Sequence, residues 1–501
     1  MPTQDARSKF TARMHPHLCE INTWVWLEEQ SARAGRPVTL GAVPDEEWDR
    51  LHDLGFDFIW LMGIWKRSPA GRRIFRTDIN SFASYDAALP GWTVDDVAGS
   101  PYSIQDYVPD PRIGNWSEVD AVRGKLRDHN MGLMLDFVPN HTGPDHPWIT
   151  SHPEYYVQGT MADFRKSPGD FFLDELDHGA HFIACGKDPF FPPWPDTAQL
   201  NALNPSTRSA MLEVLKVISS HCDGVRCDIT MLCLNDVFSK TWGPLLGGCK
   251  APTEEFWPTA IAALPDLVWL AEVYWEMEGR LQQLGFGFTY DKRFYDRLLD
   301  GTPRDVRLHL KSDLSYQNRM ARFLENHDEV RAVSAFGRER LPAIATVAAT
   351  LPGMRFYHHG QLQGKKLHAP IQLRRAPEEP PDPEISRLYT KLLQISSHEV
   401  FHQQDWKLLI AAANGDATYR NLISYRWQSG RDVRLIVANL GGTAASGRIP
   451  LGGMADASRR YLFADVLNDK DYEREGKELV ERGLFVRLEA YRAHVFKVVP
   501  M

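Results

Sequence analysis

The chain has 501 residues, too many for one small core, so we expect a large domain with accessory domains. Its formal net charge is −8 and it has no basic run, which argues against nucleic acid as a partner. No apolar run approaches the roughly 20 residues that span a membrane, and the polar N-terminal residues do not resemble a signal peptide, so we expect a cytoplasmic protein without a membrane partner.

The cysteines point to the same compartment. None of the six forms a C-x-x-C pair, and several lie in strand-like sequence. They are Cys19, Cys185, Cys222, Cys227, Cys233 and Cys249. We expect buried free thiols in a reducing cytoplasm rather than disulfides or a zinc site.

The first 140 residues alternate between predicted strands and predicted helices. β-branched and aromatic residues predict strands at 21–27, 56–62 and 132–138. A helix opens at Pro44 and ends near Gly55, and a capping box at 117–120 opens a second helix that runs to about Asn130.

This alternation breaks between His141 and Asn204. The segment contains Asp-Pro, Pro-Pro and Trp-Pro turns and shows little periodicity. We therefore expect an inserted domain after the third strand.

Alternation then resumes with a helix capped by Ser206. Five more strands are predicted, separated by helical stretches, at 222–228, 267–272, 286–290, 322–325 and 352–357. Eight strands separated by helices predict an α/β fold, a (β/α)₈ TIM barrel.

The pattern changes after a last barrel helix at 385–397. Short alternating strands follow, such as 434–438 and 493–498, which predict a C-terminal antiparallel β domain, a β-sandwich. We therefore predict three domains. The catalytic barrel comprises residues 1–140 and 205–402, the inserted domain comprises residues 141–204, and the β-sandwich domain comprises residues 403–501.

Charged and polar side chains stand at or just past the C-terminal ends of the predicted strands, where a parallel barrel places its chemistry. They are Asp136, His141, Arg226, Asp228, Glu272, His327 and Asp328. This set suits glycosidic cleavage, which uses one carboxylate as nucleophile and one protonated carboxyl as acid/base. Taken alone, Arg226-Cys227-Asp228 fits a structural ion pair about equally well.

Four short segments resemble the signature regions of the α-amylase family of glycoside hydrolases, in the family's order and at suitable spacing. They are Asp136–His141 (DFVPNH), Gly224–Asp228 (GVRCD), Ala271–Val273 (AEV) and Glu325–Asp328 (ENHD). Leu351–Met354 with Gly360-Gln361 is similar to the family's last barrel strand. The resemblance covers nearly the whole chain.

The resemblance assigns a role to each side chain. It implies Asp228 as nucleophile, Glu272 as acid/base and Asp328 as transition-state stabiliser. It also implies binding of the same sugar by Arg226, His141, His327 and a stacked Tyr102, with Asp136 organising the floor of the site.

The chain departs from the family pattern at three places. Met231 and Leu232 replace a Lys-His pair that contacts sugar and helps to bind calcium, and Asn140 alone cannot hold a calcium ion, which takes roughly six to eight oxygen ligands. We therefore expect neither a metal nor another cofactor. Gly99 replaces an Asp of members that trim single glucose units, and Gly99–Tyr102 is similar to maltosyltransferase-like members.

Three functions remain open. The first is a retaining α-glycosidase that acts on α-glucosides or short α-glucans through a covalent glycosyl-enzyme. The second is a transglycosylase, a glucan or maltosyl transferase, or an isomerase on the same scaffold, in which a sugar hydroxyl or phosphate replaces water. The third is an inactive amylase-like binding protein, against which the complete carboxylate trio argues.

Overall fold

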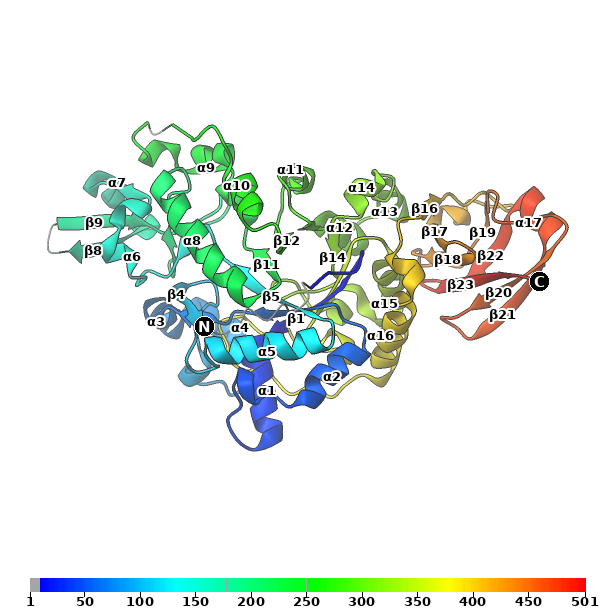
Figure 1. Ribbon diagram of the computed structural model, residues 1–501, viewed down its shortest axis with the longest axis horizontal. Coiled ribbons are helices and arrows are strands. Elements are labelled where there is room, and N and C mark those ends of the chain that lie inside the picture. The colour runs from blue at the N-terminus through cyan, green and yellow to red at the C-terminus, as the bar shows by residue number, and fades with distance from the viewer. Residues whose placement is uncertain (1–9, 177–178, 249) are drawn as a thin grey trace, which may run out of the picture.

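The core of the molecule is a closed barrel of eight parallel strands (Figure 1). The computed structural model describes residues 10–176, 179–248 and 250–501. The barrel strands, in chain order, are β1 (His17–Asn22), β2 (Phe58–Met62), β5 (Gly132–Phe137), β11 (Gly224–Cys227), β12 (Val268–Ala271), β13 (Phe288–Tyr290), β14 (Met320–Arg322) and β15 (Met354–His358). Because β15 pairs with β1, the barrel closes, and the predicted TIM barrel is confirmed.

Helices follow the strands and cover the barrel. Every residue of β1, β2, β5 and β11 is buried, as expected for parallel strands covered on both faces. The main covering helices are α1 (Thr23–Ala34), α2 (Asp45–Asp53), α5 (Trp116–Asp128), α8 (Pro205–His221), α10 (Phe256–Ala263), α11 (Glu278–Gln283), α12 (Lys292–Leu299), α13 (Pro303–His309), α15 (Ala332–Thr350) and α16 (Pro383–Ser396).

The predicted first strand at 21–27 is wrong. β1 ends at Asn22, and the aromatic run that follows is the first part of α1. The Asn22 side chain accepts a hydrogen bond from the Val25 N–H and so starts the helix. The β-branched and aromatic residues of this run are buried, so their composition reflected burial rather than strand geometry.

Two helix starts were also predicted at the wrong residue. α5 is capped by Asn115 rather than by the box at 117–120, and its side chain accepts from the Glu118 N–H. α8 is capped by Asn204 rather than Ser206, with Pro205 at its first turn.

Two extensions leave the barrel near the C-terminal ends of its strands. Between β2 and α5 lie β3 (Trp65–Arg67), α3 (Pro69–Thr77), α4 (Ile79–Ala88) and β4 (Ile104–Pro109). The segment after β5 contains β6 (His141–Thr142), α6 (Trp148–Ser151), β7 (Gln158–Gly159), α7 (Met161–Lys166), β8 (Phe171–Leu176), β9 (Gly179–Ala184) and β10 (Ala198–Gln199). Because β6 pairs with β10, the two ends of this second extension meet beside the barrel.

The C-terminal part forms a six-stranded and a two-stranded antiparallel sheet at the other end of the molecule (Figure 1). Its strands are β16 (Trp406–Leu409), β17 (Leu422–Ser429), β18 (Asp432–Asn439), β19 (Ala445–Ile449), β20 (Arg460–Asp465), β21 (Lys470–Glu475), β22 (Leu484–Leu488) and β23 (Ala493–Pro500). Trp427 fastens the large sheet to the barrel by donating from its indole N–H to the Thr350 carbonyl at 2.7 Å.

Two further expectations concern the cysteines and membrane-spanning helices. The five cysteines within the described ranges are buried free thiols, whereas Cys249 lies outside those ranges. Within the same ranges no helix has both the length and the apolarity that crossing a membrane requires.

Candidate active site

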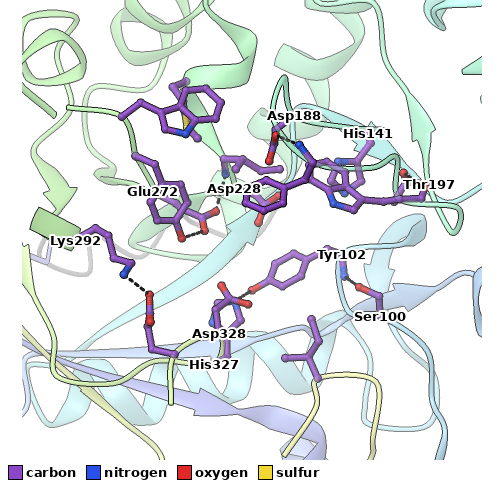
Figure 2. A pocket seen from close by; sticks show the side chains of 18 of the residues that line it. Ser100, Tyr102, His141, Asp188, Thr197, Asp228, Glu272, Lys292, His327 and Asp328 are labelled. Atoms are coloured by element: carbon purple, nitrogen blue, oxygen red, sulfur yellow. Dashed lines mark hydrogen bonds and ion pairs between the residues drawn. The ribbon is translucent and has the colours of Figure 1, made fainter. Parts of the chain in front are cut away.

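A cavity of about 910 Å³ lies at the C-terminal ends of the barrel strands (Figure 2). Six of the eight predicted site residues line it, namely Tyr102, His141, Asp228, Glu272, His327 and Asp328. Arg226 and Asp136 are almost completely buried beneath these residues. The fold therefore brings together every side chain that the sequence singled out.

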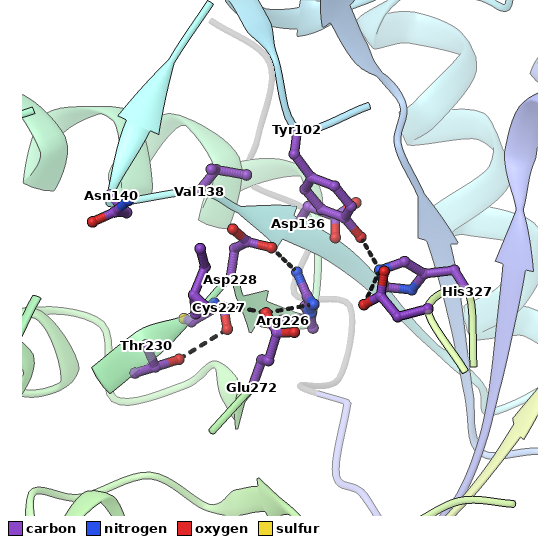
Figure 3. A network of polar contacts seen from close by, with 12 residues as sticks. Tyr102, Asp136, Val138, Asn140, Arg226, Cys227, Asp228, Thr230, Glu272 and His327 are labelled. Carbon is purple, nitrogen blue, oxygen red and sulfur yellow. Dashed lines mark hydrogen bonds and ion pairs between the residues drawn. The ribbon is translucent and has the colours of Figure 1, made fainter. Parts of the chain in front are cut away.

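Arg226 links the two carboxyl groups that face each other in this cavity (Figure 3). Its Nη1 lies 2.5 Å from Asp228 Oδ1 and its Nη2 lies 2.7 Å from Glu272 Oε2. The pairing of β11 with β12 sets this arrangement, because Cys227 and Ala271 are register partners and each precedes one of the carboxylates. A single guanidinium thus holds two acids at adjacent strand ends.

Glu272 is held by more than this ion pair. Its Oε1 accepts from the Tyr274 hydroxyl at 2.8 Å, and its Oε2 accepts from the Ile229 N–H at 2.7 Å. Burial raises the pKa of Glu272 to about 7; the Asp228 carboxylate adds to the rise and Arg226 opposes it. Glu272 therefore carries its proton for part of the time at neutral pH.

Asp228 differs from Glu272 in its contacts. Burial raises the pKa of Asp228 as well, but the Arg226 guanidinium acts against this rise both by its charge and by a hydrogen bond. Arg226 thereby favours the ionised form of Asp228. The two acids have unequal surroundings, as one nucleophile and one proton donor need.

A second charged group lies across the cavity. His327 Nε2 is 3.1 Å from Asp328 Oδ2 and 2.8 Å from the Tyr102 hydroxyl. The Asp328 and Glu20 carboxylates raise the pKa of His327 well above its usual range, although burial opposes the shift. His327 is therefore an imidazolium between two carboxylates.

His141 lies at the surface of the cavity, whereas Asp136 lies beneath it. His141 lines the cavity beside Trp194, with ring centroids 5.4 Å apart, and burial lowers its pKa to about 4, so its ring is neutral. Asp136 does not line the cavity. Its carboxylate accepts from the Trp60 indole N–H at 3.2 Å and from the Gly63 N–H at 2.8 Å, and so fixes the end of β2.

Sequence reasoning missed Glu20 on β1. Its Oε1 lies 2.5 Å from His327 Nδ1, and its Oε2 lies 2.7 Å from His358 Nδ1. Glu20 is fully buried, and it was overlooked because the first strand was placed too late in the chain. The signal available in the sequence was an acidic residue between the apolar residues Cys19 and Ile21.

Sequence reasoning also missed the residues on the Glu272 side of the cavity. Tyr274 and Trp275 follow β12, and Lys292 begins α12. Trp275 has a φ of 60° and packs against Phe190 of the inserted segment at 5.0 Å between ring centroids. Lys292 Nζ lies 3.1 Å from Glu329 Oε1.

The turn that contains Met231 and Leu232, where we expect no calcium ion, is apolar. Met231 and Leu232 are 1% and 3% exposed and lie in a short turn directly after Asp228. Across the described ranges, no three His, Cys, Asp or Glu side chains are grouped so that they could hold a metal ion.

Comparison with known proteins shows that part of this chain is similar to alpha-amylases. Residues 45–240 match the family model of the alpha-amylase catalytic domain. Alpha-amylase 3 of Dictyoglomus thermophilum is 23% identical over 301 residues, which cover 55% of this chain and 56% of that protein. The chain thus spans about half the length of this curated relative. An α-1,4-glucan:maltose-1-phosphate maltosyltransferase of Cereibacter sphaeroides is 29% identical over 173 residues, 32% of this chain and 26% of that protein.

A solved structure extends the likeness in fold to the whole chain. A maltogenic α-amylase from Thermotoga neapolitana superimposes with a TM-score of 0.69, covering 97% of this chain and 99% of that one. The sequence identity is 20%, so this match concerns the fold alone.

The coupling between the two acids leads to a first prediction. In Asp228→Asn, the pKa of Glu272 should fall by about one unit or more, because a neighbouring negative charge is lost and Arg226 is left to Glu272 alone. A ¹³C NMR titration of labelled glutamate measures it, with the Glu272 signal identified by its loss in Glu272→Gln. The matched control is Asp188→Asn, because Asp188 accepts from the Phe190 and Phe191 N–H groups rather than from Arg226. An unchanged Glu272 pKa in Asp228→Asn would contradict the coupling.

The apolar turn after Asp228 leads to a second prediction. Because the side chains of Met231 and Leu232 offer no oxygen ligands and the described residues contain no group of three His, Cys, Asp or Glu that could hold a metal ion, EDTA should leave both activity and melting temperature unchanged. Differential scanning calorimetry and an activity assay before and after chelation measure this. A drop in melting temperature that added calcium restores would show a structural metal site.

Proposed function

We propose that this chain, whose residues 45–240 match the family model of the alpha-amylase catalytic domain, is a member of the α-amylase family and a retaining α-glycosidase. Its substrates are α-glucosides or short α-glucans. The observation that carries this proposal is the placement of Asp228 and Glu272 on one buried guanidinium. Contact with the same group keeps the two carboxyls close, as a double displacement with carboxyls about 5 Å apart requires.

In the first step, the ionised Asp228 attacks the anomeric carbon of the bound sugar. The bond to the leaving oxygen breaks as Glu272 donates its proton to that oxygen. The product is a β-linked glycosyl ester on Asp228 and a released alcohol. The raised pKa of Glu272 supports its role as the acid in this step.

In the second step, Glu272 acts as a base. It takes a proton from water, whose oxygen attacks the anomeric carbon from the side that the leaving group vacated. The ester bond breaks, Asp228 regains its charge, and the configuration returns to α. The reaction uses side chains and water and needs no cofactor.

The remaining residues bind and stabilise the reacting sugar. Asp328 stands at the cavity surface beside the imidazolium of His327, where its carboxylate can stabilise the positive charge that develops in the transition state. His327 and His141 contact sugar hydroxyls. The Tyr102 ring offers an apolar face, and its hydroxyl is fixed by His327 at 2.8 Å.

A transferase reaction on the same scaffold is the second candidate. The similarity to a maltosyltransferase supports it, as does the sequence Gly99–Tyr102. A sugar hydroxyl or phosphate would then replace water in the second step. Analysis of products with and without added maltose or inorganic phosphate separates the two: longer oligosaccharides or a sugar phosphate would favour transfer.

An inactive binding protein is the third reading, and the cavity opposes it. Asp228, Glu272 and Asp328 all line one space, and Arg226 acts against the burial-raised pKa of Asp228 both by its charge and by a hydrogen bond. The buried free thiols fit our proposal of a reducing, cytoplasmic location.

A third prediction tests the nucleophile. Asp228→Asn should fold normally and lose essentially all turnover, because an amide cannot form the glycosyl ester. Circular dichroism checks folding, and glucose release from a panel of α-linked di- and oligosaccharides measures turnover. Substantial activity in a preparation free of wild-type enzyme would remove Asp228 from this role.

A fourth prediction tests Glu272 as acid/base. Glu272→Ala should lose about a hundredfold to ten-thousandfold of its rate on natural sugars, whose leaving groups need the proton. Aryl α-glucosides with acidic leaving groups should keep a fast first step and then accumulate the glycosyl-enzyme, seen by intact-protein mass spectrometry.

Azide sharpens this test because it needs no base. Added azide should release the accumulated intermediate and return an α-glucosyl azide, as two inversions require. Formation of the β-azide, or a full loss on activated substrates without azide rescue, would count against both assignments.

A further inference from the structure

The end of the cavity opposite Glu272 is bounded by two segments that are far apart in the sequence. We call residues 96–100 and 371–375 together the end wall. Ser100, Ile371 and Gln372 of this wall line the cavity. The two segments are joined by backbone hydrogen bonds from the Ala98 N–H to the Gln372 carbonyl at 2.8 Å and from the Arg374 N–H to the Asp96 carbonyl at 2.9 Å.

Arginine side chains fasten the end wall. Arg375 contacts both Asp96 carboxylate oxygens, at 2.6 and 2.9 Å, which is the strong bidentate geometry. The nearly fully buried Arg67 donates to the carbonyl of Gly99 at 2.5 Å and to that of Ile371 at 3.3 Å, and so ties the two segments from below. The Arg67 bonds act on the backbone of both segments, and the Arg375–Asp96 pair adds a side-chain link between them.

The wall also has its own hydrophobic core. Val97 and Leu373 face each other as antiparallel bridge partners, and both are fully buried. They pack with Tyr85 and Leu89 in a cluster separate from the barrel core. A cluster of this kind makes opening of the wall costly, since its apolar side chains would meet water.

The position of Glu272 in the cavity indicates which end of a bound sugar chain lies against the end wall. Under the proposed mechanism, the leaving group departs on the Glu272 side. Figure 2 shows Glu272 and Lys292 on one side of the cavity and Tyr102 and Ser100 on the other, with Asp328 between them. The side of Ser100 therefore receives the non-reducing end of the chain.

We propose that the end wall restricts this enzyme to the non-reducing ends of α-glucan oligosaccharides. This inference rests on the proposed glycosidase function and specifies its substrate. A chain that continued past the cavity would run into hydrogen-bonded backbone, whereas a chain end stops there. The Ser100 hydroxyl and the Gln372 amide at the wall can bind the free hydroxyls of a terminal glucose.

The test compares free and blocked chain ends. Maltoheptaose and isomaltoheptaose are each offered with a free non-reducing glucose and with that glucose capped as its 4,6-O-benzylidene acetal, and all products are identified by mass spectrometry. The capped sugars should be cleaved at least about ten times more slowly, because the bulky cap meets the wall. Equal rates for capped and free sugars would overturn the inference while leaving the glycosidase function intact. Cleavage of neither free sugar would instead overturn the proposed function on glucans.

A double variant assigns the effect to the wall. Asp96→Ala with Arg375→Ala removes both members of the Arg375–Asp96 pair, while Arg374, which also lies 3.9 Å from Asp96, keeps its contact with Glu28 at 3.2 Å. The double variant should raise the ratio of capped to free cleavage by roughly fivefold. The ratio does not depend on how much of the preparation is folded. The matched control removes the Asp405–Arg426 pair of the C-terminal domain, which lies at 2.9 Å, and should leave the ratio unchanged. A ratio unaltered by the wall variant would overturn the assignment to this wall.

Discussion

The burial of one positive charge, on Arg226, governs the arrangement of this site. A fully buried guanidinium is costly unless charged partners surround it, and Arg226 has two, Asp228 and Glu272. Removing either carboxylate would leave the buried Arg226 charge with one carboxylate partner in place of two. Arg226 also lies over the rings of Trp60 and Tyr290, at 5.2 and 5.8 Å from their centroids, so aromatic faces replace the water that a surface arginine would have.

A second set of charges lies across the cavity, with Glu20 and His327 buried and the Asp328 side chain 44% exposed. Glu20 and Asp328 hold the His327 imidazolium between them. Tyr102 joins the two sets, since its ring lies 5.2 Å from the Arg226 guanidinium carbon and its hydroxyl lies 2.8 Å from His327. The Tyr102 side chain is thus held by both sets of charges.

Much of this site was predictable because it depends on short-range sequence order. Asp228 and Glu272 directly follow apolar strands, so the strand pattern alone placed them at one edge of the barrel. Glu20 was missed because the neighbouring aromatic run, buried in a helix, has the composition of a strand. The helix caps Asn115 and Asn204 were missed because a serine stood close by in each case and local sequence did not rank the two.

The end wall could not have been predicted for a different reason. Asp96 and Arg375 are 279 positions apart; Asp96 ends a short 3-10 helix and Arg375 lies in a loop, and nothing in the sequence near either residue indicates the other as its partner. Such a contact exists because the barrel brings the loops after β2 and β15 to the same rim, on either side of β1. The ends of neighbouring strands determine the positions of Asp228 and Glu272. Loops far apart in the chain determine which substrates can reach these two residues. Reaction chemistry can therefore be inferred from local sequence in such a barrel, whereas the length of substrate that fits depends on long-range contacts that only the folded chain creates.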